Sequence, residues 1–578
     1  MQLHNSLMEF YSTLTRTVYS DIAVRYGLST TEYRVECEVL SLRTAKEGIS
    51  FLTKTLPALG KAVDTALSSN TSLQTRAFEK RPGSAIPKFL GWLLSRVFNA
   101  DGTPSEEGDP VALRHLRQIL YLMYKLEIPY DPKLSKTVLD SFVAVDAGIR
   151  LIDDTASTAT SKIIAKARQF TCRTFERFCP RGIIPSHGPG SVATGEASHE
   201  KVNFSRLYSG IERVYPFTEY FMFSLSHVAD DPAYLANLQV LETGTAKVVL
   251  VPKDSRGPRV ISCEPLEYQW IQQGLGRAIV QHLESHRNTA GHVNFTDQEV
   301  NRRLALVGSD TQEWVTLDMK EASDRVSLEL VKELFCGTSL LDALIATRSG
   351  FTRLPDGRLV ELKKFAPMGS ALCFPVEAFC FYALCVSVLH VLKQYPWQKA
   401  MESVYVYGDD IICKREDYAL IMQQLPCVGL MFNEGKCCTD GFFRESCGMD
   451  AYKGVPVTPV KLRTVWSRRT LNANQLASWV SYCNSLYAAG YHRAAEWLES
   501  EIASKGFRIP YAERENVSHI AYYRPRECAT ARARQLGLKL RFNPKLHRYE
   551  VLAVSAAPRY KRGDACHWRT MLSRLRGS

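Results

Sequence analysis

Two adjacent carboxylates, Asp409 and Asp410, lie between two runs of apolar residues that favour β-strands. Residues 403–413 predict a strand, a tight turn and a returning strand, and Gly408 supplies the backbone conformation of the turn. Neighbouring carboxylates on an apolar hairpin repel each other and lose hydration, so the ionised pair needs a cation. Oxygen ligands favour Mg²⁺ or Mn²⁺ over Zn²⁺. The alternative is that the two side chains only cap an exposed hairpin.

A second pair of carboxylates, Asp318 and Asp324, follows another apolar run. Residues 314–318 predict a strand that ends at Asp318, and Ser323 and Asp324 lie where the chain turns into a helix. One carboxylate can then bind a metal while the other faces a hydroxyl of a ligand. Alternatively, Ser323 or Asp324 is only a helix cap.

Three cations, Lys253, Arg256 and Arg259, lie within residues 247–261. Two β-rich runs flank a loop that Gly and Pro stiffen. Guanidinium groups bind phosphate oxygens in a bidentate fork, so the loop suits a triphosphate. A solvated basic hairpin is the alternative.

The segment between the two acidic pairs contains a hairpin and a helix. Residues 353–360 predict a hairpin on a Pro-Asp-Gly turn. Gly369 and Ser370 then open an apolar helix, where glycine lets the backbone approach a ligand closely; an ordinary helix start is the alternative. The apolar run 379–389 is about half as long as a membrane span, which indicates a buried helix.

Length and composition limit the class of protein. A chain of 578 residues is expected to contain several subdomains. The net charge of +12 favours a polyanionic partner, with nucleic acid preferred to a membrane. The 16 cysteines include no Cys-x-x-Cys pair, which favours reduced thiols in a cytoplasm, and no secretory signal is expected at the N-terminus.

The two ends of the chain carry weaker signals. Apolar periodicity predicts helices near 86–98 and 113–126. Beyond residue 471, one helical face carries Leu476, Trp479, Val480, Cys483 and Leu486 and predicts core packing. The tail from Arg524 to Arg576 mixes cations with aromatic residues, which suits either a nucleic-acid path or a solubilising surface.

Taken in chain order, these motifs resemble the palm of a viral RNA-directed RNA polymerase. The order is basic loop, strand ending in Asp318, Gly-Ser helix, Asp-Asp hairpin and a segment that contains Lys436. The set is most similar to the replicase catalytic subunit of positive-strand RNA bacteriophages, the levivirus group. The elements typical of that group are residues 251–253, residues 261–265, Asp297-Gln298 with Asn301, residues 443–448 and the break at 187–190.

The resemblance implies an α+β fold shaped as a right hand, with a palm made of an antiparallel sheet backed by helices. Its expected domains are fingers over 1–310, which include the basic loop 247–261, a palm over 311–462 with a finger hairpin inserted at about 348–364, and a helical thumb with the basic C-terminal region over 463–578.

The resemblance also implies roles for the acidic residues. Asp318 and Asp409 are the expected ligands of two Mg²⁺ ions, for which Mn²⁺ can substitute, and Asp410 assists them. Lys436 matches the residue that donates a proton to the departing pyrophosphate.

Nucleotide contacts follow from the same resemblance. The expected NTP-binding residues are Lys253, Arg256 and Arg259 at the triphosphate, Ser323 and Asp324 at the ribose, and Gly369 and Ser370 beside the nascent base pair. The chain departs from phages of the Q-beta type at Ser370, where they carry Asn after Met-Gly.

The implied partners are the RNA template and product, NTPs, host elongation factors Tu and Ts, and a host RNA-binding protein, in the cytoplasm of the bacterial host and without a membrane. Two alternatives stay open. A reverse transcriptase shares the palm, but that class places an aromatic residue where Asp324 stands. A non-catalytic RNA-binding scaffold would need only the basic tail.

Overall fold

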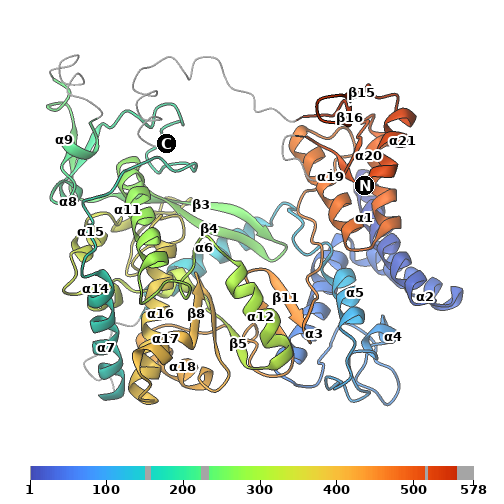
Figure 1. Ribbon diagram of the computed structural model, residues 1–578, viewed down its shortest axis with the longest axis horizontal. Coiled ribbons are helices and arrows are strands. Elements are labelled where there is room, and N and C mark those ends of the chain that lie inside the picture. Colours follow the sequence, from blue (N-terminus) through green and yellow to red (C-terminus); the bar gives the residue numbers. More distant parts are fainter. Residues whose placement is uncertain (1, 150–157, 223–232, 514–518, 556–578) are drawn as a thin grey trace. The chain divides into compact units, whose positions relative to one another are not determined.

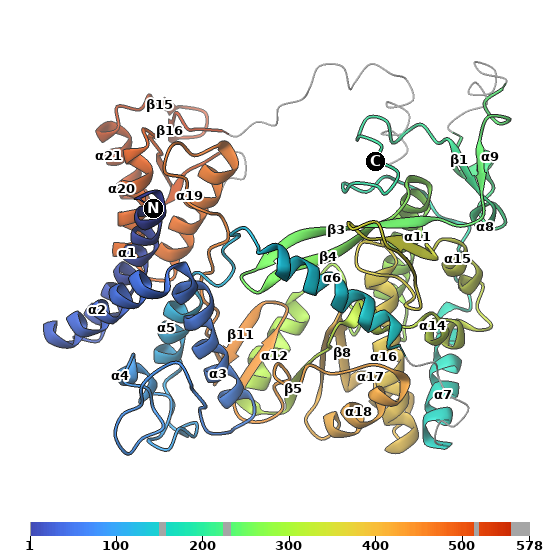
Figure 2. The same cartoon turned by 180° about the vertical axis from the view of Figure 1, so that it is seen from behind.

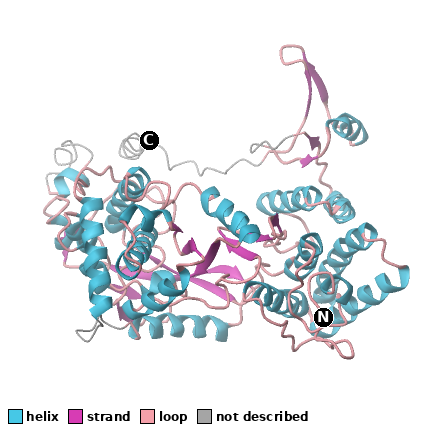
Figure 3. Cartoon of the chain, turned by 60° about the horizontal axis from the view of Figure 1, so that its bottom comes forward, coloured by secondary structure: helices cyan, strands magenta, loops and turns pink. Residues whose placement is uncertain are grey.

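The computed structural model describes residues 2–149, 158–222, 233–513 and 519–555. Among these residues the chain divides into two compact units. Unit 1 comprises residues up to 129, residues 253–256 and residues from 457, and unit 2 comprises 130–252 and 257–456. Figure 3 shows that helices and strands are both abundant, which confirms the α+β class. The last part of the basic tail, 556–578, lies outside the described residues.

A three-stranded antiparallel sheet in unit 2 carries the predicted acidic residues. Its strands are β5 (Trp314–Asp318), β9 (Asp410–Lys414) and β8 (Val404–Tyr407), in that order. The predicted strand and the predicted Asp-Asp hairpin are therefore both confirmed. Four of the five residues of β5 are buried, because α12 (Glu299–Thr311) packs on this strand.

The core of unit 2 is centred on α16 (Cys373–Leu392). This helix packs against β8 and against α7 (Thr158–Phe175), which runs beside it in Figure 1. By length and composition alone α16 could cross a membrane, but 83% of its apolar stretch is buried inside the protein. The predicted buried helix is confirmed.

A second sheet of four strands has the order β4-β3-β6-β7. Its members are β3 (Thr245–Asp254), β4 (Gly257–Cys263), β6 (Phe351–Arg353) and β7 (Leu359–Glu361). The β6–β7 hairpin confirms the predicted Pro-Asp-Gly turn, with Gly357 at a φ of +91°. In Figure 2, α6 (Pro132–Ala147) crosses in front of this sheet, and it packs on β4.

The other elements of unit 2 frame these two sheets. They are β1 (Arg206–Tyr208), α8 (Ser209–Glu212), α9 (Phe217–Tyr220), β2 (Gln239–Leu241), α11 (Leu266–Ser285), α13 (Ala322–Arg325), α14 (Leu328–Phe335), α15 (Leu340–Ala346), α17 (Trp397–Glu402), α18 (Tyr418–Gln424), a short 3-10 helix (Leu425–Val428), β10 (Phe443–Ser446), β11 (Met449–Tyr452) and β12 (Val455–Pro456).

Unit 1 combines helices from the early and late parts of the chain. They are α1 (Gln2–Arg25), α2 (Thr30–Glu47), a π-helical turn (Phe51–Thr55), α3 (Leu56–Ser68), α4 (Gly91–Leu94), α5 (Pro110–Tyr121), α19 (Ala473–Ala488), α20 (His492–Ser504) and α21 (Arg526–Gln535), with the strands β13 (Tyr511–Ala512), β14 (Tyr522–Tyr523), β15 (Leu540–Asn543) and β16 (Arg548–Val551). Helix α1 packs on α20. Phe10 stacks on Trp466 with 4.5 Å between ring centroids, and the Trp466 N–H donates to the Tyr11 hydroxyl.

Two sequence predictions for unit 1 have different outcomes. The buried residues of α19 are the five of the predicted stripe, which is confirmed. The helix predicted over 86–98 is wrong, because only Gly91–Leu94 is helical. Leu90 has a φ of +54°, a left-handed conformation that a continuous right-handed helix excludes. The apolar residues of this segment are buried in an irregular chain instead.

Candidate active site

The predicted metal ligands gather at one end of the β5-β9-β8 sheet. Asp318, the last residue of β5, is the register partner of Asp410, the first residue of β9. Asp409 occupies the turn before it, after Gly408. Gly408 has a φ of +61°, and an added Cβ atom would lie 2.1 Å from the ring of Phe374. The turn therefore requires glycine on both conformational and steric grounds.

The carboxyl group of Asp410 reports the charge at this end of the sheet. Burial raises its pKa to about 6, and the charges of Asp409 and Asp318 add to the rise. The backbone N–H of Cys447 donates to Asp410 Oδ2 at 2.9 Å and partly opposes the rise. The three carboxylates thus share one region with an excess of negative charge.

The N–H that reaches Asp410 comes from the turn between β10 and β11. Cys447 and Gly448 have φ values of +48° and +75°, the positive values that a two-residue type I′ hairpin requires. This turn belongs to the run 443–448, for which no role was predicted from the sequence. Asn301 of α12, which is fully buried, donates to the backbone carbonyl of Asp410 at 3.3 Å.

Lys436 and Asn433 contact Asp318 from a segment that follows β5 on its other side. The Asn433 N–H donates to the Asp318 carbonyl at 2.8 Å, and Thr316 and Cys438 form a bridge. Lys436 Nζ then lies 3.0 Å from Asp318 Oδ1, and Asn433 Nδ2 lies 2.8 Å from Asp318 Oδ2. Burial lowers the pKa of Lys436, but the charges of Asp318 and Glu445 outweigh it and raise the pKa overall. The ammonium group is therefore protonated at neutral pH.

The carboxylates suit a hard divalent cation. Their ligand atoms are all oxygens, and the raised pKa of Asp410 shows negative charge that the protein does not fully compensate. Within the described residues, however, no three His, Cys, Asp or Glu side chains are already arranged around a metal position. Asp318 is engaged by Lys436 and Asn433.

Ser323 and Asp324 lie on α13, six residues or fewer beyond the end of β5. Ser323 is buried. Asp324 Oδ1 accepts a hydrogen bond from Lys364 Nζ at 2.8 Å. No local sequence signal pointed to Lys364, because the two residues lie on segments separated by α14, α15 and the β6–β7 hairpin.

The Gly369-Ser370 segment packs tightly against β4. Gly369 has a φ of +122°, and a Cβ atom there would lie 2.3 Å from the Ser262 carbonyl oxygen. The Ser370 hydroxyl donates to Gln272 Oε1 of α11 at 3.1 Å. The hydroxyl is thus committed to a protein contact, and a place for Ser370 beside a nascent base pair stays a prediction.

The three cations of the basic loop have different surroundings. The β3–β4 hairpin confirms the two predicted β-runs, and all three side chains are exposed. Lys253 and Arg256 belong to unit 1, whereas Arg259 lies on β4 in unit 2. Arg256 pairs with Asp254 at 2.7 Å, and this carboxylate raises the pKa of Arg256. Binding of a triphosphate by the three cations stays a prediction.

Glu377, in the first turns of α16, is a buried carboxyl group that the sequence analysis did not select. Burial raises its pKa well above the ordinary value, and the charge of Asp409 adds to the rise. Cys373 Sγ lies 3.6 Å from Glu377 Oε2. Burial therefore favours the neutral form of Glu377 beside the acidic cluster. The signal in the sequence was a single Glu in an otherwise apolar helix.

Sequence comparison places these residues within a known family region. The family model described as "RNA replicase, beta-chain" matches residues 220–490. The chain is 36% identical over 238 residues to the RNA-directed RNA polymerase subunit beta of Qbeta virus (strain MX1), which covers 41% of this chain and 39% of that protein. It is 32% identical over 216 residues to the RNA-directed RNA polymerase beta chain of Escherichia phage MS2, covering 37% of each.

The crystal structure of the RNA-dependent RNA polymerase of a human picorbirnavirus superposes with a TM-score of 0.37 at 14% identity, over 66% of this chain and 75% of that chain. The chain spans about two fifths of the length of the curated relatives it matches. Residues 220–490 thus match the RNA replicase beta-chain family, and the predicted resemblance to the replicases of RNA bacteriophages is confirmed.

Proposed function

We propose that this chain is the catalytic subunit of an RNA-directed RNA polymerase that replicates a positive-strand phage RNA genome from NTPs. One observation carries the proposal. Asp318 and Asp410 face each other across β5 and β9, with Asp409 at the adjoining turn, inside the segment that matches the replicase family. Nucleotidyl transfer asks a protein mainly for positioning and for stabilisation of charge.

The proposed reaction uses two Mg²⁺ ions, for which Mn²⁺ can substitute, held by Asp318 and Asp409 with help from Asp410. When bound, such ions lower the pKa of the attacking 3′-hydroxyl and stabilise the leaving pyrophosphate. The protein orients the ligands: Cys447 holds Asp410 through its N–H, and Asn433 holds Asp318 through its side chain. Lys436, which its raised pKa keeps protonated, is the proposed donor of the proton that the departing pyrophosphate takes up.

The incoming NTP is assigned to the residues around this centre. The proposed contacts are Lys253, Arg256 and Arg259 at the triphosphate, Ser323 and Asp324 at the ribose, and Gly369 and Ser370 at the nascent base pair. Asp324 favours ribonucleotides over deoxyribonucleotides, because a carboxylate accepts a hydrogen bond from a 2′-hydroxyl whereas an aromatic side chain would exclude it.

The proposed right hand places the palm on the β5-β9-β8 sheet and its flanking helices, the fingers in the segments before residue 311, and the thumb on α19 and α20. Host elongation factors Tu and Ts and a host RNA-binding protein are proposed partners, in the bacterial cytoplasm. Their support is the likeness to the phage beta subunits.

The decisive experiment measures NTP incorporation on an RNA template with Mg²⁺, together with RNA affinity at fixed salt. We expect the wild-type chain to incorporate NTPs in preference to dNTPs. We expect Asp409→Asn to abolish incorporation and to leave RNA affinity within about twofold, because phosphate contacts by cations dominate affinity. The matched control is Asp342→Asn, an equal change of charge on an exposed residue of α15 in the same unit.

Other outcomes identify the rival functions. Preference for dNTPs would indicate a reverse transcriptase. Parallel loss of incorporation and RNA affinity in Asp409→Asn, or RNA binding by a wild-type chain that incorporates nothing, would favour an RNA-binding scaffold, for which the basic residues of the C-terminal region are sufficient.

A further inference from the structure

Lys364 is a fully buried lysine, with 0% of its side chain exposed. Its ammonium group lies 2.8 Å from Asp324 Oδ1, 3.7 Å from Asp146 Oδ1 and 3.7 Å from the centroid of the Phe142 ring. Burying a lysine is costly unless a carboxylate pairs with it. The pair with Asp324 therefore compensates the buried charge of Lys364 within unit 2.

The backbone on both sides of Lys364 is held from two directions. Asp146, at the end of α6, accepts the N–H groups of Lys363 at 3.1 Å and Lys364 at 3.0 Å. Arg348 donates to the carbonyls of Leu362, Lys364 and Phe365 at 2.9, 3.1 and 3.0 Å. A backbone fixed on its donor and acceptor sides leaves the lysine side chain little freedom of direction.

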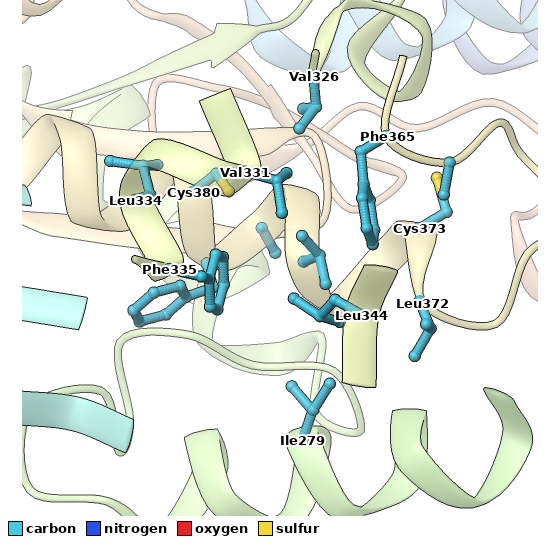
Figure 4. Close-up of a cluster of buried hydrophobic side chains, with 14 of the residues drawn as sticks. Ile279, Val326, Val331, Leu334, Phe335, Leu344, Phe365, Leu372, Cys373 and Cys380 are labelled. Atoms are coloured by element: carbon cyan, nitrogen blue, oxygen red, sulfur yellow. The ribbon is translucent and has the colours of Figure 1, made fainter. Parts of the chain in front are cut away.

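The same segment is joined directly to the chain that follows Asp324. The Phe365 N–H donates to the Val326 carbonyl at 2.8 Å, and the Leu328 N–H donates to the Lys363 carbonyl at 2.9 Å. Figure 4 shows the side chains of Val326 and Phe365 in one buried cluster with Cys373 of α16. Lys364 and Asp324 are thus kept in a fixed register.

The pair is asymmetric in its exposure. Lys364 is inaccessible, whereas 23% of the Asp324 side chain is exposed. The lysine holds one carboxylate oxygen from inside the protein, and part of the same side chain stays accessible from outside. An acceptor fixed in this way discriminates better than a freely rotating one, because no ordering cost falls on binding.

We infer that Lys364 is a positioning residue for ribose selection, which keeps Asp324 oriented to accept a hydrogen bond from the 2′-hydroxyl of the incoming nucleotide. The inference rests on the proposed polymerase function. A site built to bind a hydroxyl rejects an analogue that lacks it, because its buried polar groups are then left unpaired. Lys364 acts only through Asp324 and touches no substrate.

The test compares Lys364→Met with Lys363→Met. Lys363 is the exposed neighbour, so the same substitution there is a matched control. The readout is the ratio of kcat/KM for an NTP to that for its 2′-deoxy analogue. In Lys364→Met we expect the ratio to fall about tenfold to a hundredfold, mainly through a higher KM for the NTP, because a hydrogen bond to a charged group is weakened. Lys363→Met should keep the wild-type ratio.

A second comparison separates positioning from simple stability. If Lys364 acts through Asp324, the double variant Asp324→Asn with Lys364→Met has the same ratio as Asp324→Asn alone. The double variant also leaves no uncompensated charge of this pair. Should Lys364→Met fail to fold, Asp146→Asn loosens the backbone around Lys364 without changing either member of the pair, and a smaller fall is expected.

The failures are distinguishable. An active Lys364→Met protein with the wild-type ratio and only a lower melting temperature overturns the inference and leaves the polymerase intact. An unchanged ratio in Asp146→Asn, where Lys364→Met does not fold, overturns it as well. A wild-type chain that incorporates no NTP overturns the proposed function and this inference together.

Discussion

Two groups of carboxylates in unit 2 have their charge balanced in different ways. The first group is Asp324 with Asp146, around Lys364, and the second is Asp318 with Asp409 and Asp410, at the end of β5. Asp324 is paired with a lysine that solvent cannot reach, and Asp146 is held by two backbone N–H groups. At Asp318 the pairing lysine is Lys436, whose side chain is 46% exposed. The first group has a permanent partner, whereas the second has a removable one.

The difference teaches where an external cation can act. A buried ion pair gives fixed orientation, and removal of one partner is strongly unfavourable. A half-exposed pair contributes little to stability and can reorganise at low cost. Burial raises the pKa of Asp410, and the negative charges of Asp409 and Asp318 add to this rise in the second group. We therefore expect Asp324 to serve orientation and an external cation to act at the second group.

Removal of a carboxylate from the second group, which contains Asp318, should have the largest effect. We expect Asp318→Asn to reduce NTP incorporation roughly 1,000-fold or more, because the reaction depends on charge stabilisation at this point. We also expect Mg²⁺ to raise the melting temperature of the wild-type chain, since a cation that binds only the folded state stabilises it, and we expect Asp318→Asn to abolish this rise. Activity assays and thermal melts with and without Mg²⁺ measure both effects.

The first group, in which Lys364 pairs with Asp324, provides the contrast for this prediction. Lys364→Met should retain the full rise in melting temperature with Mg²⁺. A loss of that response in Lys364→Met equal to the loss in Asp318→Asn would show that the two groups are one site, and the comparison would break.

The removable lysine should have the next largest effect. We expect Lys436→Met to lower kcat about 100-fold with little change in KM, as for the loss of a general acid. The fall in single-turnover incorporation should be the same at every pH measured, because the raised pKa keeps Lys436 protonated throughout. Lys332→Met is the control, because Lys332 has the same exposed fraction, 46%, and also pairs with a carboxylate. Wild-type rates in Lys436→Met would leave this lysine with a structural role only.

The smallest effect concerns stability without metal. The pKa of Asp410 in the folded chain, about 6, lies above its ordinary value of 3.8. The folded state therefore binds more protons, and stability should fall as the pH rises from about 4 to about 6 and stay level above. At neutral pH the ionised Asp410 therefore lowers the free energy of unfolding by roughly 1 to 3 kcal/mol, and Asp410→Asn removes this destabilisation.

Thermal melts of the two proteins in a chelator, from pH 4.5 to 7.5, measure this contribution. The gap between the melting temperatures should widen up to about pH 6. A gap that is constant across the range would show that the charge of Asp410 is already compensated, and the contrast between the two groups would weaken.

The local signals in the sequence predicted the centre of the site. Alternating apolar residues and a Gly-Asp-Asp turn were sufficient for β8 and β9, and one apolar run that ends in Asp318 was sufficient for β5. These predictions depended on periodicity over a few residues, which tertiary packing did not override. The same holds for the buried stripe of α19.

The contacts that hold the site could not be predicted in this way. Lys364 meets Asp324, and Cys447 meets Asp410, only because distant segments pair in one particular register. In the basic loop, the sequence showed the three cations but did not show that Asp254 pairs with Arg256 and compensates its charge. Over 86–98, apolar spacing marked burial and was mistaken for helical periodicity.

The joining of α1 to α20 within unit 1 has a consequence for how the protein is made. During translation, the first helices leave the ribosome long before their partners exist, and all of unit 2 is synthesised in between. The contacts of Phe10 and Tyr11 with Trp466 can therefore form only after Trp466 has emerged. The acidic sheet can assemble early, whereas the unit that holds both early and late helices closes last. In a nascent chain we therefore expect the sheet with the acidic residues to form before unit 1 is complete, and chaperones to have the longest time to bind the N-terminal helices.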